Sequence, residues 1–452
     1  MKASRLKTIV LLIWGSIVLL CIMLSLVALA DENVRALFVP VSGGVQVTTT
    51  RTPRQISQNA TPSPGILYLP SATARAATAM PVTPTAPFTI PLPMAQYAVT
   101  LGPDANPLTG LIPADPAILN RRPVAVKISS FPRGLVRPYQ TGLTQADLVF
   151  EYYIEDGLTR FIAVFYSRDA SRAGPVRSGR YFDEYIMRMY HSALVYGHAD
   201  KRVEDHLLES DLRPYLFEEQ NNYFPPLWDS GSKNAENRLF VDTAGVGSKL
   251  SNNSRQSLRP PLFASLLYPQ SLPAIDRIYT HYSIYSYNYW EYDPASKMYK
   301  RFVDAADATS LGQGEVYTAQ IDNLNGTQFS ADNIVVLVVP HIFHNEFDRA
   351  DQVLDIALQG TGSAYVFRNG RMIKATWTRD QIDQPIQLKD EKGLAVPMKA
   401  GVTCYQVIDP ESTISQTDGT MDFRFFIQLF KVTPTPTPFG WEPTPTPTKV
   451  KH

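Results

Sequence analysis

Two arginines and a serine come together in a short loop, and their spacing is suited to binding an anion. The loop runs from Gly174 to Arg180 and contains Arg177 and Ser178. A helix is expected directly after Arg180, and helix N-termini present N–H groups without intrahelical partners and the positive end of the helix dipole. Each guanidinium adds a planar set of donors matched to carboxylate or phosphate. The loop therefore predicts an anion site, but it does not name a reaction.

A β-hairpin before the loop and a helix after it would position these side chains. The hairpin strands are predicted at Leu148–Tyr153 and Thr159–Tyr166, with a turn between them, and the helix at Tyr181–Tyr190. Two further polar residues lie on the hairpin. We therefore predict a ligand site built from five residues: Arg160, Arg177, Ser178, Arg180 and Glu151.

A structural role for the same arginines stays open. Arginines beside a strand often hold carboxylates of their own chain, and the candidates here are Glu151, Asp169, Asp183 and Glu184. A shallow surface contact with an anion adds only about 0.3–1 kcal/mol. Desolvated charge-assisted hydrogen bonds add about 1.5–3 kcal/mol each, so only these would make the loop a specific site.

Other residues that could do chemistry form weaker patterns. The segment His341–Asp348 contains two histidines and two carboxylates, but the HExxH spacing is missing and no metal site is predicted. Ser178 has no obvious base beside it in the sequence, so no catalytic residue is assigned. The alternating aromatics of Tyr279–Tyr292 fit core and cross-strand pairs as well as a sugar-binding face. No cofactor is implied, and whether the protein is an enzyme stays open.

The N-terminus has the pattern of a membrane segment. Basic residues precede an uncharged apolar run, Thr8–Ala30, which at about 1.5 Å per residue can cross the roughly 30 Å hydrocarbon core. Residues 1–30 are predicted to be a single-pass anchor, with everything after Ala30 outside the cytoplasm. The alternative is a signal peptide cleaved after Ala30, which would make the protein secreted.

Composition divides the rest of the chain. Residues 31–101 and 432–452 are crowded with proline and threonine and are predicted to be a tether and a disordered tail. Between them we expect an α+β fold, with a mixed α/β N-terminal domain at 102–268 and a mostly antiparallel, β-rich C-terminal domain at 269–431. Acidic and basic residues are equal in number, 42 each, which argues against a nucleic-acid partner.

Three patterns support strands in the second part. The run Ile334–Val339 is continuous and β-branched, which is typical of a buried central strand. The pair Asn369-Gly370 separates two apolar runs and predicts a hairpin. Cys404 lies in an apolar run and is expected to be packed rather than reactive.

Several of these segments together resemble the YerB-like family of bacterial exported proteins, a domain of unknown function with an N-terminal and a C-terminal part. The motifs that carry the resemblance cover nearly the whole globular region: Asn106–Gly110, Arg122–Ile128, Ala146–Glu151, Thr159–Phe161, Gly174–Arg180, Tyr299–Arg301, Asn333–Val336, Gly362–Ala364, Asn369–Gly370 and Ala375–Trp377. Family members are typically lipoproteins, which implies an extracytoplasmic location. This chain lacks the lipobox, and it has Glu236–Phe240 where the family tends to carry Pro-His-Asn-Leu before an aromatic residue.

The function that follows is that of an extracytoplasmic cell-envelope protein. It would contact the membrane through its N-terminal helix and bind an anionic ligand or a protein partner through the arginine loop. One alternative is an envelope enzyme acting on a phosphate-containing substrate, which rests on a similarity of layout to the LytR-CpsA-Psr phosphotransferases. The other alternative is a structural scaffold with no ligand.

Overall fold

The computed structural model describes residues 99–221, 223–265, 271–305, 314–345, 347–348 and 350–428. The predicted membrane segment, nearly all of the tether and the predicted tail lie outside these residues. Within the described ranges, no helix combines the length and the apolar character needed to cross a bilayer.

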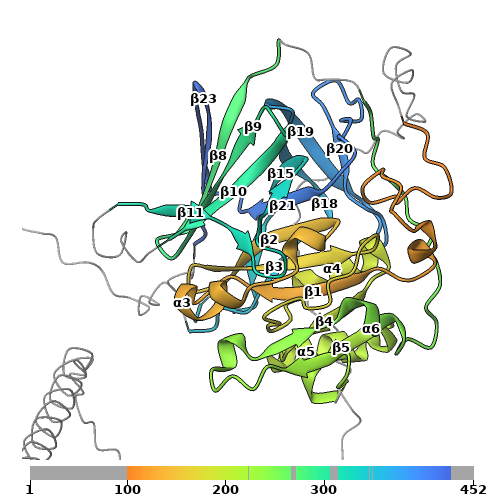
Figure 1. Ribbon diagram of the computed structural model, residues 1–452. Helices are drawn as coiled ribbons and strands as arrows, with labels where there is room; N and C mark the ends of the chain where they lie inside the picture. The colour runs from red at the N-terminus through yellow and green to blue at the C-terminus, as the bar shows by residue number, and fades with distance from the viewer. Residues whose placement is uncertain are drawn as a thin grey trace, which may run out of the picture. The chain divides into compact units, whose positions relative to one another are not determined.

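Ten strands of the described chain, drawn from both of its parts, form one sheet (Figure 1). In spatial order they are β20 (Gln387–Lys389), β19 (Arg371–Arg379), β18 (Gly360–Arg368), β15 (Asn333–Val338), β21 (Thr403–Ile408), β2 (Leu148–Glu155), β3 (Leu158–Phe165), β1 (Val124–Ser129), β4 (Ala193–Tyr196) and β5 (Leu216–Glu218). Strand β21 pairs in parallel with both β15 and β2. One hydrogen-bonded sheet therefore joins the N-terminal and C-terminal parts.

A second sheet, made only of C-terminal strands, packs on one face of the first. Its strands are β11 (Tyr317–Ala319), β10 (Met298–Asp304), β9 (Ser286–Asp293), β8 (Ile275–Ser283), β23 (Gly419–Arg424) and β22 (Thr413–Thr417), with β14 (Ser330–Ala331) paired to β10. Thr280 Oγ1 of β8 donates to Gln406 Oε1 of β21 at 2.8 Å, a contact between buried side chains of the two sheets. These two buried polar groups are therefore each other's partners across the interface.

In the part of the chain that the structure covers, three strand pairs lie outside these sheets: β6 (Leu227–Asp229) with β7 (Leu239–Val241), β12 (Ile321–Asp322) with β13 (Thr327–Gln328), and β16 (His341–Phe343) with β17 (Leu354–Ile356). The shorter helical elements are α3 (Arg133–Val136), α6 (Thr243–Gly247) and the 3-10 turns η1 (Pro116–Leu119), η2 (Arg137–Tyr139), η3 (Leu143–Gln145), η4 (Arg213–Tyr215), η5 (Glu219–Asn221) and η6 (Ala235–Asn237).

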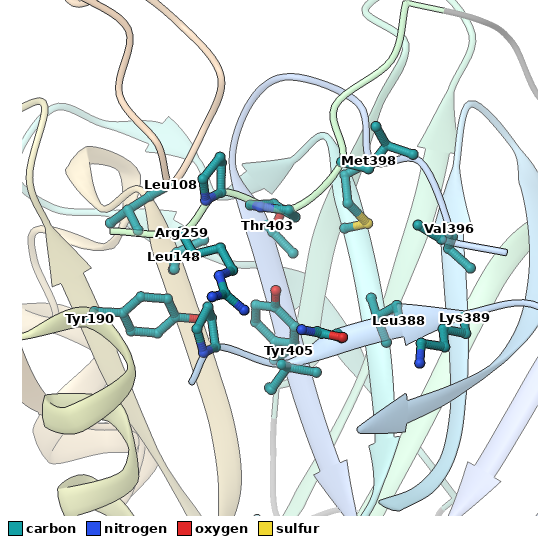
Figure 2. Close-up of a pocket in the computed structure, with 17 residues that line it drawn as sticks. Leu108, Leu148, Tyr190, Arg259, Leu388, Lys389, Val396, Met398, Thr403 and Tyr405 are labelled. Carbon is teal, nitrogen blue, oxygen red and sulfur yellow. The ribbon is translucent and has the colours of Figure 1, made fainter. Parts of the chain in front are cut away.

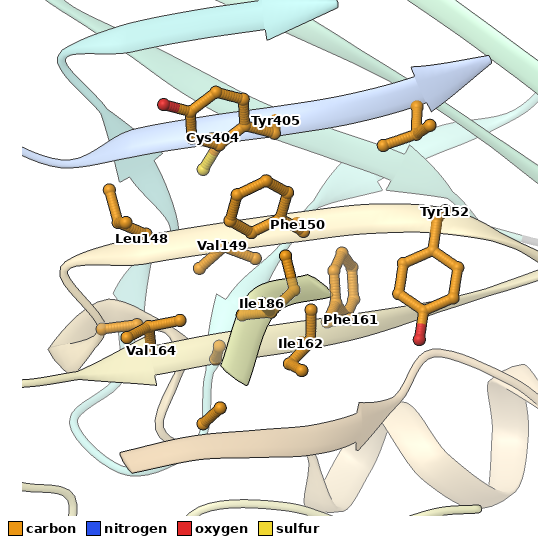
Figure 3. Packing of buried hydrophobic residues seen from close by; sticks show 14 of the residues in the cluster. Leu148, Val149, Phe150, Tyr152, Phe161, Ile162, Val164, Ile186, Cys404 and Tyr405 are labelled. Atoms are coloured by element: carbon orange, nitrogen blue, oxygen red, sulfur yellow. The ribbon is translucent and has the colours of Figure 1, made fainter. Parts of the chain in front are cut away.

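Helix α4 (Tyr181–Tyr190) covers the other face of the large sheet. Its buried residues recur at helical spacing, and the ring of Phe182 packs on that of Phe150 at 6.3 Å between centroids. Figure 3 shows Ile186 of this helix over the side chains of β2 and β3, with Tyr405 of β21 beside Phe150. Helix α5 (Lys201–Glu209) begins at Asp200, whose Oδ1 accepts a hydrogen bond from the N–H of Arg202 at 2.9 Å.

Local sequence patterns located these elements well. The hairpin β2–β3, helix α4 and the interior strand β15 lie where the sequence predicts them. Asn369 and Gly370 connect β18 to β19 with φ angles of 50° and 70°, as a two-residue hairpin turn requires. The mixed α/β character of the N-terminal part and the largely β character of the C-terminal part are confirmed. The sheet that the two parts share was not predicted.

Candidate anion-binding site

The arginine loop is fixed by backbone hydrogen bonds to three neighbouring segments. Three of its backbone N–H groups donate to backbone carbonyl oxygens: Val176 to Leu239 at 2.7 Å, Arg177 to Lys127 at 3.0 Å and Gly179 to His198 at 2.8 Å between nitrogen and oxygen. These three amides are therefore not available to an anion. An anion here would have to be held by side chains and by the remaining N–H groups at the start of the helix.

Gly174 allows the loop to enter this position. Its φ angle is 147°, and a Cβ atom at this residue would lie 2.8 Å from the ring of Phe240. Glycine is the residue that tolerates both the positive φ and the close approach. The start of the loop is thus set by a residue without a side chain.

Arg160 is a buried cation of the site without an ion pair among the described residues. It is 7% exposed and lies opposite Tyr152 across β2 and β3. Its Nη1 donates to Ser129 Oγ at 3.0 Å, its Nε has no acceptor, and no described carboxylate forms an ion pair with it. Burial, together with the positive charges of Arg177 and Arg180, lowers the pKa of Arg160 to about 9, against the smaller opposing effect of Glu155 and Glu236. A buried guanidinium without a direct ion pair is costly, and an anionic ligand would relieve that cost.

Arg177 and Arg180 are both ion-paired near the surface. Arg177 Nη2 donates to a carboxylate oxygen of Glu236, and Arg180 Nη2 donates to Glu155 Oε1 at 2.7 Å. The two arginine side chains are 19% and 15% exposed. Both arginine side chains therefore form ion pairs within the protein, but their partners are not among the four carboxylates considered from the sequence. Pairs at partly exposed positions contribute little to stability, so a ligand can compete for the same guanidinium groups.

Lys127 is a fourth cation that the sequence analysis did not select. Its Nζ lies 3.0 Å from Asp183 Oδ1 and 4.0 Å from the centre of the Tyr152 ring, and both Lys127 and Asp183 are fully buried. Burial lowers the pKa of Lys127 to about 7, against the opposing effect of Asp183. The available signal was a charged residue inside the apolar run Val124–Ile128, where only a paired lysine is tolerated.

Asp183 also fixes the loop to helix α4. Its Oδ2 accepts a hydrogen bond from the backbone N–H of Arg180 at 2.9 Å. The same carboxylate accepts a hydrogen bond from the hydroxyl of Tyr152. Asp183 therefore links the helix start, β1 and β2, and its charge is already satisfied. Ser178 lies half-buried in the loop, and its carbonyl accepts from Arg180 Nη1 at 3.3 Å.

The structure does not bring Glu151 to the loop. Successive residues of a strand point to opposite faces, so Glu151 points away from the side of Tyr152 and Arg160. It lies between the two sheets, where Arg301 Nη2 donates to its Oε2 at 2.6 Å and Gln406 Nε2 donates to the same atom at 3.1 Å. Glu151 and Arg301 are 3% and 2% exposed. This carboxylate has a structural partner and is not available to a ligand at the loop.

The histidines of the second part are separated from one another. His341 is buried, with Nδ1 at 2.8 Å from the carbonyl oxygen of Val339, while the ring of His344 stacks on Tyr181 at 4.6 Å. Glu346 lies outside the described residues. Among the residues that the structure covers, no group of three or more His, Cys, Asp or Glu side chains is arranged to hold a metal ion.

Comparison with known proteins assigns the family. Residues 108–256 match the N-terminal domain of a family described as a protein of unknown function (DUF3048), and residues 278–404 match its C-terminal domain. The chain therefore belongs to this family. It is 28% identical over 329 residues to the Bacillus subtilis (strain 168) protein described as "Putative lipoprotein YerB". The match covers 69% of this chain and 89% of the relative. The resemblance seen in the sequence motifs is confirmed.

The crystal structure of the YerB protein from Bacillus subtilis has a similar fold. The TM-score is 0.55 at 23% sequence identity, and the match covers 67% of this chain and 96% of the other. At this identity the similarity concerns the fold and carries no statement about a ligand.

Proposed function

We propose that this protein is an extracytoplasmic envelope protein that binds an anionic group through Arg160, Arg177 and Arg180. The observation that carries the proposal is Arg160, a buried guanidinium with no carboxylate partner among the described residues. A charge buried without a counter-charge is rarely kept for stability, because an apolar side chain of similar size is often neutral or better. A ligand that supplies the missing negative charge explains why it is kept.

The surrounding charges favour a small anion. Four cations, Lys127, Arg160, Arg177 and Arg180, face three carboxylates from Asp183, Glu155 and Glu236. Glu155 and Glu236 lie at the more exposed side, so they would act as competitors that a bound anion replaces. Phosphate and carboxylate groups both fit the donor geometry of paired guanidinium groups.

The envelope location rests on two observations. The relative from Bacillus subtilis carries the name of a lipoprotein, and such proteins are held at a membrane surface. The apolar run Thr8–Ala30 would anchor this chain, and the proline- and threonine-rich tether would hold the folded part away from the bilayer.

A phosphate titration followed by thermal unfolding tests the proposal. Phosphate at about a hundredfold excess over its Kd should stabilise the full-length protein by about 2.7 kcal/mol. Arg177→Ala should abolish most of this effect and change the unliganded stability by less than about 1 kcal/mol, because its ion pair with Glu236 is partly exposed. Arg277→Ala is a matched control, since Arg277 pairs with Glu291 on a different sheet. Equal phosphate effects in both variants would contradict the proposal.

A further inference from the structure

A cavity lies where the two family domains meet, apart from the arginine loop; it is called the junction pocket below. It has a volume of about 270 Å³. One wall is the segment Arg259–Leu262, which connects the domain matched at 108–256 to the domain matched at 278–404. Tyr190, at the C-terminal end of α4, lies on another wall. The arginine loop precedes the N-terminus of this helix, about 15 Å away along its axis.

The inner surface of this junction pocket is apolar. Leu148, Leu388, Val396 and Met398 line it and are all buried side chains. Figure 2 shows them around an open space between β2, β20 and β21. Ligand pockets are typically apolar cavities with a few polar groups, and they occur preferentially at domain interfaces. A cavity of about 150 Å³ holds benzene, so this volume suits an aliphatic chain on the order of ten carbon atoms.

Two tyrosine hydroxyls are among the polar groups that line the cavity. Tyr190 and Tyr405 lie next to each other, and burial raises the pKa of both hydroxyls, which keeps them neutral. A neutral tyrosine hydroxyl can both donate and accept a hydrogen bond. A polar end of a ligand can therefore be received at this point of the cavity.

Two cations line the same cavity. Arg259 is exposed and Lys389 is half-buried, and neither forms an ion pair with a carboxylate in the described part of the chain. Figure 2 shows the Arg259 side chain reaching toward the space between Tyr190 and Tyr405. An apolar interior with unpaired cations at its border is complementary to a molecule that has an apolar chain and one negative charge.

We propose that the junction pocket binds a medium-length aliphatic chain that ends in a carboxylate. The chain lies among Leu148, Leu388, Val396 and Met398, and the carboxylate pairs with Arg259 beside the two tyrosine hydroxyls. This site is separate from the arginine loop, so either binding proposal can be wrong without affecting the other.

Photo-crosslinking of the full-length protein tests the site directly. The probe is decanoate that carries a diazirine in its chain, and the labelled peptides are mapped by mass spectrometry after irradiation. Label is expected on peptides that contain Leu388–Met398 or Tyr405. Unlabelled decanoate should remove it, whereas decanol should compete about tenfold more weakly because it lacks the charge that Arg259 would bind.

Three variants complete the test. Arg259→Gln, at an exposed position, should lower labelling about tenfold without affecting folding. Lys392→Gln removes an equal charge at an exposed position outside the pocket and should leave labelling unchanged. Val396→Trp should fill the cavity and abolish labelling. Label confined to other segments, equal competition by decanol, or unchanged labelling of Arg259→Gln would each overturn the proposal.

Discussion

Arg160 and Glu151 lie on the two strands of one hairpin, yet their side chains serve opposite faces of the sheet. Arg160 faces helix α4 and the arginine loop, where no described carboxylate pairs with it. Glu151 faces the second sheet and pairs with Arg301. Both residues precede the arginine loop in the sequence. A shift of one position along a strand moves a side chain to the opposite face of the sheet. For this reason, only one of the two belongs to the candidate site.

Glu151→Gln should show that this carboxylate is structural. The change leaves Arg301 buried with an uncompensated charge, so the free energy of unfolding should fall by about 3–5 kcal/mol in urea denaturation. Glu291→Gln, which unpairs the exposed Arg277, should cost less than about 1 kcal/mol. The stabilisation by phosphate should persist in Glu151→Gln. Equal costs for the two variants would argue against a structural role of the buried pair.

At the scale of elements, helices α4 and α5 are joined by an ion pair that depends on pH. His206 Nε2 of α5 lies 2.5 Å from Glu184 Oε2 of α4, and Arg188 Nε donates to the other oxygen at 2.7 Å. The hydrogen bond to Glu184 raises the pKa of His206 above its usual value of 6.5. A raised histidine pKa means that the folded state holds the proton more tightly than the unfolded state.

This pair predicts the pH range in which His206 contributes to stability. The contribution is fully present below pH 6.5 and is lost as the pH rises through the raised pKa. His206→Gln should therefore lower the free energy of unfolding at pH 5.5 and leave it unchanged at pH 8.5. Since the ring is partly exposed, the loss should stay below about 1 kcal/mol. Urea unfolding at both pH values measures it, and an equal loss at both would contradict the assignment.

Local elements could be predicted from the sequence, whereas the partners of central strands could not. The hairpin β2–β3 and helix α4 follow from local periodicity and turn residues. The parallel pairing of β2 with β21 brings together Glu151 and Gln406, which are 255 residues apart, and no local pattern specifies such a partner. The same limit applies to the site, because Glu155 and Glu236 reach the arginines only through the tertiary fold.

At the scale of the whole molecule, the two family domains are parts of one described body. Strand β21 of the C-terminal part lies between β15 and β2, so removing it would leave one edge of each of these strands unpaired. Exposed strand edges and apolar surface make such a separation unfavourable. The two domains should therefore unfold together.

Limited proteolysis tests this expectation. The loop Ser251–Ser257 is rich in small polar residues, mostly exposed and free of regular structure, so it should be nicked before strand β15. The two fragments should then co-elute in size-exclusion chromatography and separate only in denaturant. Fragments that separate in native buffer would show that the shared sheet does not hold the parts together.

The most direct test of the anion site is the stability of Arg160→Met with and without phosphate. If Arg160 is kept for a ligand, removing its buried charge should leave the unliganded melting temperature unchanged or higher, while the phosphate-induced rise seen in the parent protein should disappear. The opposite pattern, a large fall in the unliganded melting temperature together with no phosphate effect in the parent, would mean that Arg160 supports the fold alone and would contradict the proposed function.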